Sequence, residues 1–140
     1  MNVIIMGCGR VGARLAIELD KQGHRVTVID RLTSSFERLG KGYGGNTVIG
    51  TGIDEDVLRS SGIDSTDIFI ATTNADNRNI MGAQVAKTIF RVPHVIVRLY
   101  DPVRAEAYRT MGLDTICPTT TISGLILDMI DGYGHQTGSN

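Results

Sequence analysis

The sequence is poor in several residue types, and their scarcity excludes whole classes of protein. Tryptophan is absent, aromatic residues make up only 5% of the chain, and there are two cysteines, Cys8 and Cys117. Neither cysteine belongs to a CxxC pair or has a histidine nearby in sequence, so we expect no disulfide framework and no zinc or other metal site. This cysteine usage predicts a reducing, cytoplasmic location.

A surplus of charge of one sign is also missing. Fourteen lysines and arginines stand against 15 aspartates and glutamates, giving a net charge of −1. Without excess positive charge, we expect no nucleic-acid partner. No apolar run approaches the ~20 residues that span a bilayer, and residues 1–6 are too short for a signal peptide. Any contact with a membrane is therefore expected to come through a partner.

The length and composition suit one soluble domain. The chain has 140 residues, of which 41% are hydrophobic, 21% are charged and 17 are glycines. A chain of this size buries roughly 68–70% of its unfolded surface, which is enough for a core but leaves no room for a second domain.

Short apolar runs alternate with amphipathic stretches, a pattern typical of β-α-β units around a parallel sheet. We predict an α/β fold, a Rossmann-like doubly wound parallel six-stranded sheet in the order 3-2-1-4-5-6. Asp101 followed by Pro102 indicates the start of one helix. The predicted strands are residues 2–6, 25–30, 46–50, 67–71, 94–99 and 115–117, and the shorter predicted helices are residues 34–39, 55–60 and 102–111.

A separate helix is predicted for residues 121–131, after the last strand. Its apolar stripe has two interpretations: it packs on the chain's own sheet, or it docks on another chain. We place the domain boundary at residue 131, so that residues 1–131 form the domain and residues 132–140 form a flexible tail. The stripe consists of Ile122, Leu125, Ile126, Met129 and Ile130.

A glycine-rich loop, GCGRVG at residues 7–12, follows the first predicted strand and opens the first helix. This GxGxxG context is typical of dinucleotide-binding folds. Gly7 would allow a tight turn, Gly9 the close approach of phosphates, and Gly12 close packing of the helix, whose N-terminus attracts anions. Within the loop, Arg10 and Val11 are also candidate binding residues. Val11 begins the apolar face of the helix, and Arg10 either reaches a terminal phosphate or is a solvated surface residue.

Asp30 ends the second predicted strand, roughly 20 residues after Gly12, which is the spacing of the acidic residue that binds ribose hydroxyls. Glycines can merely turn the chain, but together with Asp30 they predict nucleotide binding. The Asp30 carboxylate repels a 2′-phosphate and so disfavours a phosphorylated dinucleotide. Arg31 beside it either pairs with such a phosphate or stacks on adenine, and we favour stacking.

Two further segments follow strand ends, and one charged residue lies near the end of a strand, at the edge where open sheets bind ligands. Residues 50–52 follow the third strand and residues 72–74 follow the fourth. Arg98 interrupts the apolar fifth strand, and a buried charge there needs a partner. That partner is either Asp101 or the phosphates of a ligand.

Taken together, these residues resemble the nucleotide-binding N-terminal lobe of the potassium-conductance regulators, the RCK or KTN family of potassium channels and transporters. The similarity covers roughly residues 1–130. Beyond the glycine loop it rests on residues 28–31 (VIDR), 48–52 (VIGTG) with Asp54 and Leu58, 62–64 (GID), 72–76 (TTNAD) with Asn79, and Val97-Arg98 with Asp101-Pro102.

The resemblance implies a regulatory lobe that binds an adenine nucleotide, NAD(H) or ATP/ADP, without turnover. It also implies a homodimer or higher oligomer, in which residues 121–131 form a crossover helix. The oligomer would be attached to an integral-membrane potassium transporter or channel subunit at the inner face of the cell membrane. Carried over by position, the binding residues are Gly7, Gly9 and Gly12 at the phosphates, Asp30 at the ribose, Arg31 at the adenine, Thr51, Gly52 and Ile53 along the base, and Thr72, Thr73, Asn74 and Arg98 at the phosphates.

Two features depart from the family pattern. Many relatives have Gly-Asp-Ala where this chain has GTG at residues 50–52, which removes a carboxylate near the adenine. The family's C-terminal ligand-sensing lobe is also missing, so the chain is expected to be a one-lobe subunit, a partner of a separate lobe, or a fragment.

The rival hypothesis is the cofactor domain of an NAD-dependent oxidoreductase, which needs a proton donor next to the nicotinamide. Tyr100 and Tyr108 have no lysine three or four residues later, and none of the three histidines is placed as a catalytic acid. A methyltransferase would require a reversed hairpin at the end of the sheet, which the sequence does not predict. We therefore favour a regulatory subunit that is not an enzyme.

Overall fold

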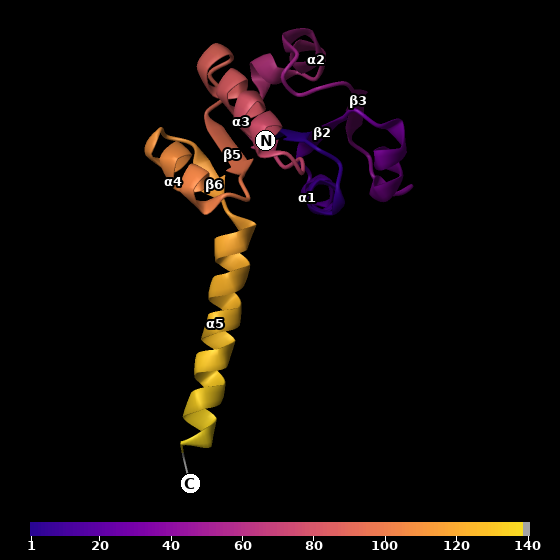
Figure 1. The fold of residues 1–140 in the computed structure, drawn as a ribbon. Coiled ribbons are helices and arrows are strands. Elements are labelled where there is room, and N and C mark those ends of the chain that lie inside the picture. The colour runs from indigo at the N-terminus through magenta and orange to yellow at the C-terminus, as the bar shows by residue number, and fades with distance from the viewer. Residues whose placement is uncertain (139–140) are drawn as a thin grey trace.

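The computed structural model describes residues 1–138, which form a parallel sheet flanked by helices and a long C-terminal helix (Figure 1). The strands are β1 (Asn2–Met6), β2 (Arg25–Asp30), β3 (Asn46–Ile49), β4 (Ile68–Ala71), β5 (His94–Arg98) and β6 (Asp114–Ile116). The α-helices are α1 (Arg10–Lys21), α2 (Glu55–Ser60), α3 (Asp76–Gln84), α4 (Pro102–Thr110) and α5 (Pro118–Thr137). Two 3₁₀ helices, η1 (Thr33–Leu39) and η2 (Ile63–Ser65), and a π-helical turn, η3 (Val85–Ile89), complete the chain.

The sheet confirms the predicted fold. Its order is β3-β2-β1-β4-β5-β6, and every neighbouring pair is parallel. The bounds of β1, β2 and α2 are the predicted ones, and the other predicted strands differ by one residue at one or both ends. Apolar β-branched runs predict buried parallel strands well because both faces of such strands are covered by helices.

The sheet separates two core layers. Side chains alternate along β1, so that Val3 and Ile5 join the cluster on one face and Ile4 and Met6 join the cluster on the other. Helix α1 and η1 supply the first cluster, and α2, α3, η3 and α4 supply the second. With both faces covered, ligands can reach the sheet only at its edges and strand ends.

Close packing at the start of α1 depends on glycine. Gly7 has φ +108°, in the left-handed region that side chains rarely adopt. A Cβ atom on Gly12 would collide with the Gly7 carbonyl oxygen. The turn from β1 into α1 is therefore as tight as the motif predicts.

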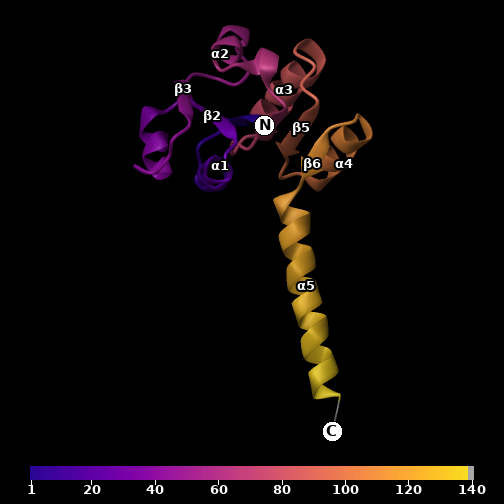
Figure 2. The same ribbon diagram turned by 180° about the vertical axis from the view of Figure 1, so that it is seen from behind.

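Helix α5 does not pack its apolar stripe on the sheet of its own chain. None of its residues is buried, and both views show it extending away from the sheet (Figures 1 and 2). The interpretation that it packs on its own sheet is wrong. Among residues 1–138, no helix is long and apolar enough to cross a membrane.

The predicted flexible tail is also partly wrong. Helix α5 continues through residue 137 instead of ending near residue 131, whereas residues 139–140 lie outside the described part. The small, polar residues after position 131 predicted fraying, but a glycine inside a helix costs only about 1 kcal/mol and need not end it.

Candidate functional site

A cavity of about 510 Å³ lies at the carboxyl ends of strands β1 to β5. The loops that follow these strands form its walls, together with side chains from η1 and α3. The strand order reverses between β1 and β4, and open parallel sheets bind ligands at that point. The volume is within the range of roughly 300–1,000 Å³ typical of small-molecule sites.

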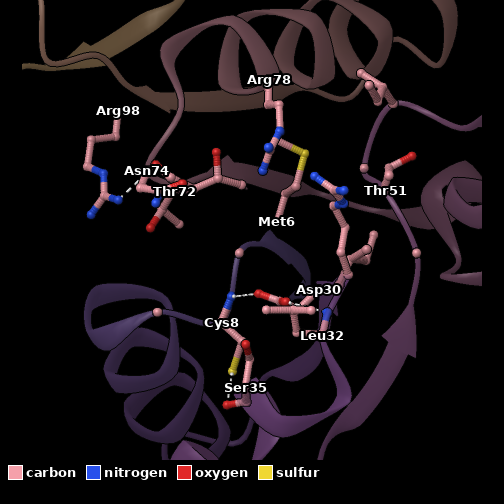
Figure 3. A pocket seen from close by; sticks show the side chains of 18 of the residues that line it. Met6, Cys8, Asp30, Leu32, Ser35, Thr51, Thr72, Asn74, Arg78 and Arg98 are labelled. Atoms are coloured by element: carbon pink, nitrogen blue, oxygen red, sulfur yellow. Dashed lines mark hydrogen bonds between the residues drawn. The ribbon is translucent and has the colours of Figure 1, made fainter.

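Asp30, the last residue of β2, ties the glycine loop to the turn that follows β2. Its Oδ2 accepts a hydrogen bond from the Cys8 amide at 2.8 Å, and its Oδ1 accepts one from the Leu32 amide at 2.8 Å (Figure 3). Bonds to a carboxylate are stronger than bonds between neutral groups. Each carboxylate oxygen retains capacity to accept a further bond from a ligand.

Positive charge dominates the lining of the cavity. Four guanidinium groups and one carboxylate line it, and within residues 1–138 none of the four arginines forms an ion pair with a carboxylate. A concave site with unpaired cations concentrates anions. The arginines are Arg31, Arg38, Arg78 and Arg98.

Arg98 does not pair with Asp101, which is one of its two predicted partners. Its Nη2 donates to the Thr73 carbonyl oxygen at 2.8 Å, and its guanidinium lies 5.1 Å from the centroid of the Tyr100 ring. The Asp101 side chain instead caps α4, accepting from the Val103 amide at 3.0 Å. The guanidinium is thus held by a carbonyl and a ring, neither of which neutralises its charge.

Two polar atoms on this wall have no hydrogen-bond partner in the described part of the chain. They are Thr72 Oγ1 and Arg98 Nε, and both residues line the cavity. Thr72 is only 4% exposed. Because buried polar groups are nearly always hydrogen-bonded, a pair of unpartnered ones indicates a place for a ligand with acceptor oxygens.

Cys8 lies in the loop but is not suited to redox sensing. Its side chain is fully buried, and its Sγ donates to the Ser35 carbonyl oxygen at 3.3 Å. Burial raises the pKa of the thiol, and the negative charge of Asp30 raises it further, against a smaller lowering by Arg38. The group therefore stays protonated and acts as a small filler.

Most of the predicted site residues line the cavity, and three do not. Gly12 lies beneath the loop, Val11 is exposed on α1, and Arg10 lines a separate groove with Arg14 and Arg38. The lining set contains the remaining predictions, Gly7, Gly9, Asp30, Arg31, Thr51, Gly52, Ile53, Thr72, Thr73, Asn74 and Arg98.

The departure from Gly-Asp-Ala after β3 has a steric reason at its last position. A Cβ atom on Gly52 would collide with Met6 Sδ. Met6 also fills the space beside Gly82 of α3, where an added Cβ atom would lie 2.7 Å from the same sulfur. The Met6 side chain thus forms part of the cavity lining in this chain and requires glycine at residue 52.

Sequence reasoning missed seven lining residues. Arg78 was the most accessible to prediction, because it lies in the first turn of α3, and helix starts share an edge with strand ends. Arg38 comes from η1, whose orientation no local pattern indicates. The missed residues are Met6, Cys8, Ile29, Leu32, Ser35, Arg38 and Arg78.

Comparison with known sequences identifies related proteins. The family model of the TrkA-N domain matches residues 3–119. The Trk system potassium uptake protein TrkA of Streptomyces coelicolor is 50% identical over 116 residues, which cover 83% of this chain and 52% of that protein. This chain therefore spans about half the length of that relative.

Solved structures share the fold at low identity. The Kef CTD of Shewanella denitrificans in AMP-bound form has a TM-score of 0.76 and 19% identity, covering 96% of this chain and 82% of that one. The GsuK RCK domain has a TM-score of 0.78 and 22% identity over 99% of this chain and 29% of its own. The GsuK channel bound to NAD has a TM-score of 0.71 and 21% identity over 86% of this chain and 22% of its own. Because the family model covers most of the residues and the sheet has the expected order, the chain belongs to the TrkA-N domain family.

Proposed function

We propose that this chain is the adenine-nucleotide-binding regulatory domain of a potassium uptake system and has no catalytic activity of its own. The observation that carries the proposal is the cavity, in which a glycine loop, Asp30 and four unpaired arginines surround one space. The relative from Streptomyces coelicolor is a Trk system potassium uptake protein, and similar folds have been solved with AMP and with NAD.

The lining suits each part of an adenine nucleotide. Apolar groups of Met6, Ile29 and Ile53 offer contacts for a base, beside the predicted base residues Thr51 and Gly52. Asp30 keeps acceptor capacity for ribose hydroxyls. Gly9 has open space where its Cβ would be, so that phosphates can approach the loop backbone without a side chain in the way.

The arginines suit the phosphates. Figure 3 shows Arg78 entering from α3 and Arg98 lying beside Thr72 and Asn74, across the cavity from Asp30. A guanidinium pairs with phosphate through two parallel hydrogen bonds. These two arginines would thus contact the phosphates from the side of the cavity opposite Asp30, while the glycine loop contacts them from the side of Asp30.

The lining also favours binding over catalysis. It includes no histidine, tyrosine or lysine among the described residues, and Asp30 is the only carboxylate. An oxidoreductase needs a group that donates or accepts a proton beside the nicotinamide. Since Asp30 already accepts two backbone amides, it is placed to hold a ribose and not to shuttle a proton.

Calorimetric titration with NADH, ADP and ATP tests the proposal. Asp30→Ala should weaken binding by ~1–3 kcal/mol, because it leaves ribose hydroxyls and two loop amides unpaired. Asp64→Ala, an exposed carboxylate in η2, serves as the control and should bind like the wild type. Unchanged isotherms for Asp30→Ala would remove this residue from the site, and failure of the wild type to bind any of the three nucleotides would overturn the proposal.

The proposal includes a second copy of the chain as a partner. Helix α5 exposes Ile122, Leu125, Ile126, Met129 and Ile130, each more than half accessible. A lone helix in water is marginally stable, and most helices in proteins are stabilised by packing of an apolar face. The stripe is therefore proposed to pair with the same stripe of another copy.

In this proposal the oligomer works in the cytoplasm, at the inner face of the cell membrane. A potassium transporter or channel subunit holds it there, and nucleotide occupancy changes the geometry that the oligomer imposes on that subunit. A nucleotide can do so only by binding one geometry more tightly than the other.

A further inference from the structure

Asn79 is a fully buried polar residue of α3 that lies behind the cavity wall and does not line the cavity. Its amide uses all its hydrogen-bonding positions. Oδ1 accepts from the Thr73 amide at 2.9 Å and from the Thr73 hydroxyl at 2.6 Å, while Nδ2 donates to the Thr73 carbonyl at 3.0 Å and to the Arg98 carbonyl at 2.8 Å. One side chain thereby joins the segment after β4 to the last residue of β5.

The same carbonyl of Thr73 also accepts the Arg98 guanidinium, through Nη2 at 2.8 Å. Asn79, Thr73 and Arg98 therefore form a closed network in which the backbone and the side chain of Arg98 are both held. Because the Asn79 amide is buried and uses every hydrogen-bonding position, it fixes one arrangement of these segments, and any change leaves a polar group unpaired in the core.

This arrangement leaves two polar atoms among residues 1–138 without a hydrogen bond on the side of the network that faces the cavity. Arg98 Nε and Thr72 Oγ1, which flank the network, have no partner within the described residues. A fold selected only for stability would pair these atoms, since each unpaired buried polar group is unfavourable. Their retention indicates that something other than the protein supplies the acceptor, and in a cavity lined by arginines that is an anionic oxygen.

We propose that Asn79 is a positioning residue for ligand binding, which touches no ligand but holds the ends of β4 and β5 so that Arg98 Nε and the Thr72 hydroxyl face the phosphates unpaired. The inference rests on the proposed function, because it assumes an adenine nucleotide in the cavity. It assigns Asn79 a role through Arg98. Replacing Asn79 should therefore weaken binding of the phosphates much more than binding of the nucleoside.

The test compares Asn79→Ala, Arg98→Gln and the double variant by titration with ADP and with adenosine. Asn79→Ala should weaken ADP binding by about tenfold or more and adenosine binding by much less. In the Arg98→Gln background, Asn79→Ala should have little further effect on ADP, because residues that act through one another are not additive. Equal losses for both ligands, or additive losses for ADP, would overturn the inference.

Asn77→Ala is the matched control, since Asn77 lies on the same helix but is exposed and accepts from Arg104 at 2.7 Å. It should bind ADP like the wild type. Asn79→Asp provides a second variant if Asn79→Ala does not fold. It keeps the acceptor toward the Thr73 amide and hydroxyl, loses the donors toward the Thr73 and Arg98 carbonyls, and should show the same selective loss of ADP affinity.

The outcomes separate this inference from the proposed function. If the wild type binds neither NADH nor ADP, the proposed function fails. If the wild type binds ADP and folded Asn79 variants bind it equally well, only the role of Asn79 fails. Thermal denaturation of each variant shows whether it is folded at the temperature of the titration.

Discussion

Replacing Thr72 with valine separates stability from binding at a single atom. Valine has the shape of threonine but lacks the hydroxyl, and Thr72 Oγ1 has no partner among residues 1–138 although the residue is 4% exposed. In most buried positions the loss of a hydroxyl breaks a hydrogen bond. Here it removes a group that the protein leaves unpaired, so the variant should be more stable and should bind more weakly.

The size of both effects follows from the burial of the hydroxyl. An unsatisfied buried hydroxyl costs roughly 1–3 kcal/mol in proteins. Because Thr72 borders the cavity, we take the lower end and expect the free energy of unfolding to rise by about 1 kcal/mol. For a domain of this size, that corresponds to an increase in Tm of about 4 °C. A hydrogen bond to a charged ligand oxygen contributes ~1.5–3 kcal/mol, so ADP affinity should fall by about tenfold or more.

Thermal unfolding without ligand and calorimetric titration with ADP measure the two effects. Thr115→Val is the matched control, because Thr115 is also buried but its hydroxyl donates to the Ala105 carbonyl at 3.2 Å. The control should lose stability and keep its affinity. A lower Tm for Thr72→Val together with unchanged ADP affinity would refute the reasoning, since the hydroxyl would then have a partner inside the protein.

Two further predictions concern α5 and the glycine loop. Leu125→Lys combined with Met129→Lys should give a monomer by light scattering. Asp128→Lys combined with Asp131→Lys, on the polar side of the same helix, is the control and should leave the oligomer intact. An oligomer that survives the Leu125 and Met129 substitutions would contradict pairing through the stripe. Cys8 should resist iodoacetamide at pH 8 in the folded protein and react in urea, because burial holds its pKa above the ordinary value of 9.0. Since the folded-state pKa is the raised one, the stability that the protonated thiol contributes is complete below about pH 9 and is lost as the pH rises above it. The free energy of unfolding of Cys8→Ala should therefore fall less than that of the wild type between pH 8 and pH 11. Equal alkylation rates with and without urea would contradict the buried thiol.

The agreement between the predicted and observed sheet has a local cause. Buried parallel strands read as short runs of valine and isoleucine, and the chain has such runs at β1, β2 and β5, separated by helical segments. The site residues found in advance are those at strand ends, because topology places all strand ends at one edge. Gly7, Asp30 and Thr72 were accessible in this way.

The site residues that escaped prediction reach the cavity from other elements. Arg78 and Arg38 come from α3 and η1, and their approach depends on how those helices pack on the sheet. The interpretation of Arg98 as a partner of Asp101 failed for a related reason. The two residues are close in sequence, but the turn between them directs Asp101 into the start of α4 and Arg98 toward Thr73.

Local sequence was sufficient for the strands, most of the helices, the glycine loop and the carboxylate at the end of β2, because each depends on periodicity or on contacts within a few residues. Tertiary structure alone decided which cations share the cavity, which buried atoms stay unpaired, and that Asn79 joins two strand ends. It also decided that α5 leaves the sheet instead of covering it. An apolar stripe specifies that a helix needs a partner, but only the packing of the remaining elements determines whether the chain itself has a surface left to provide one.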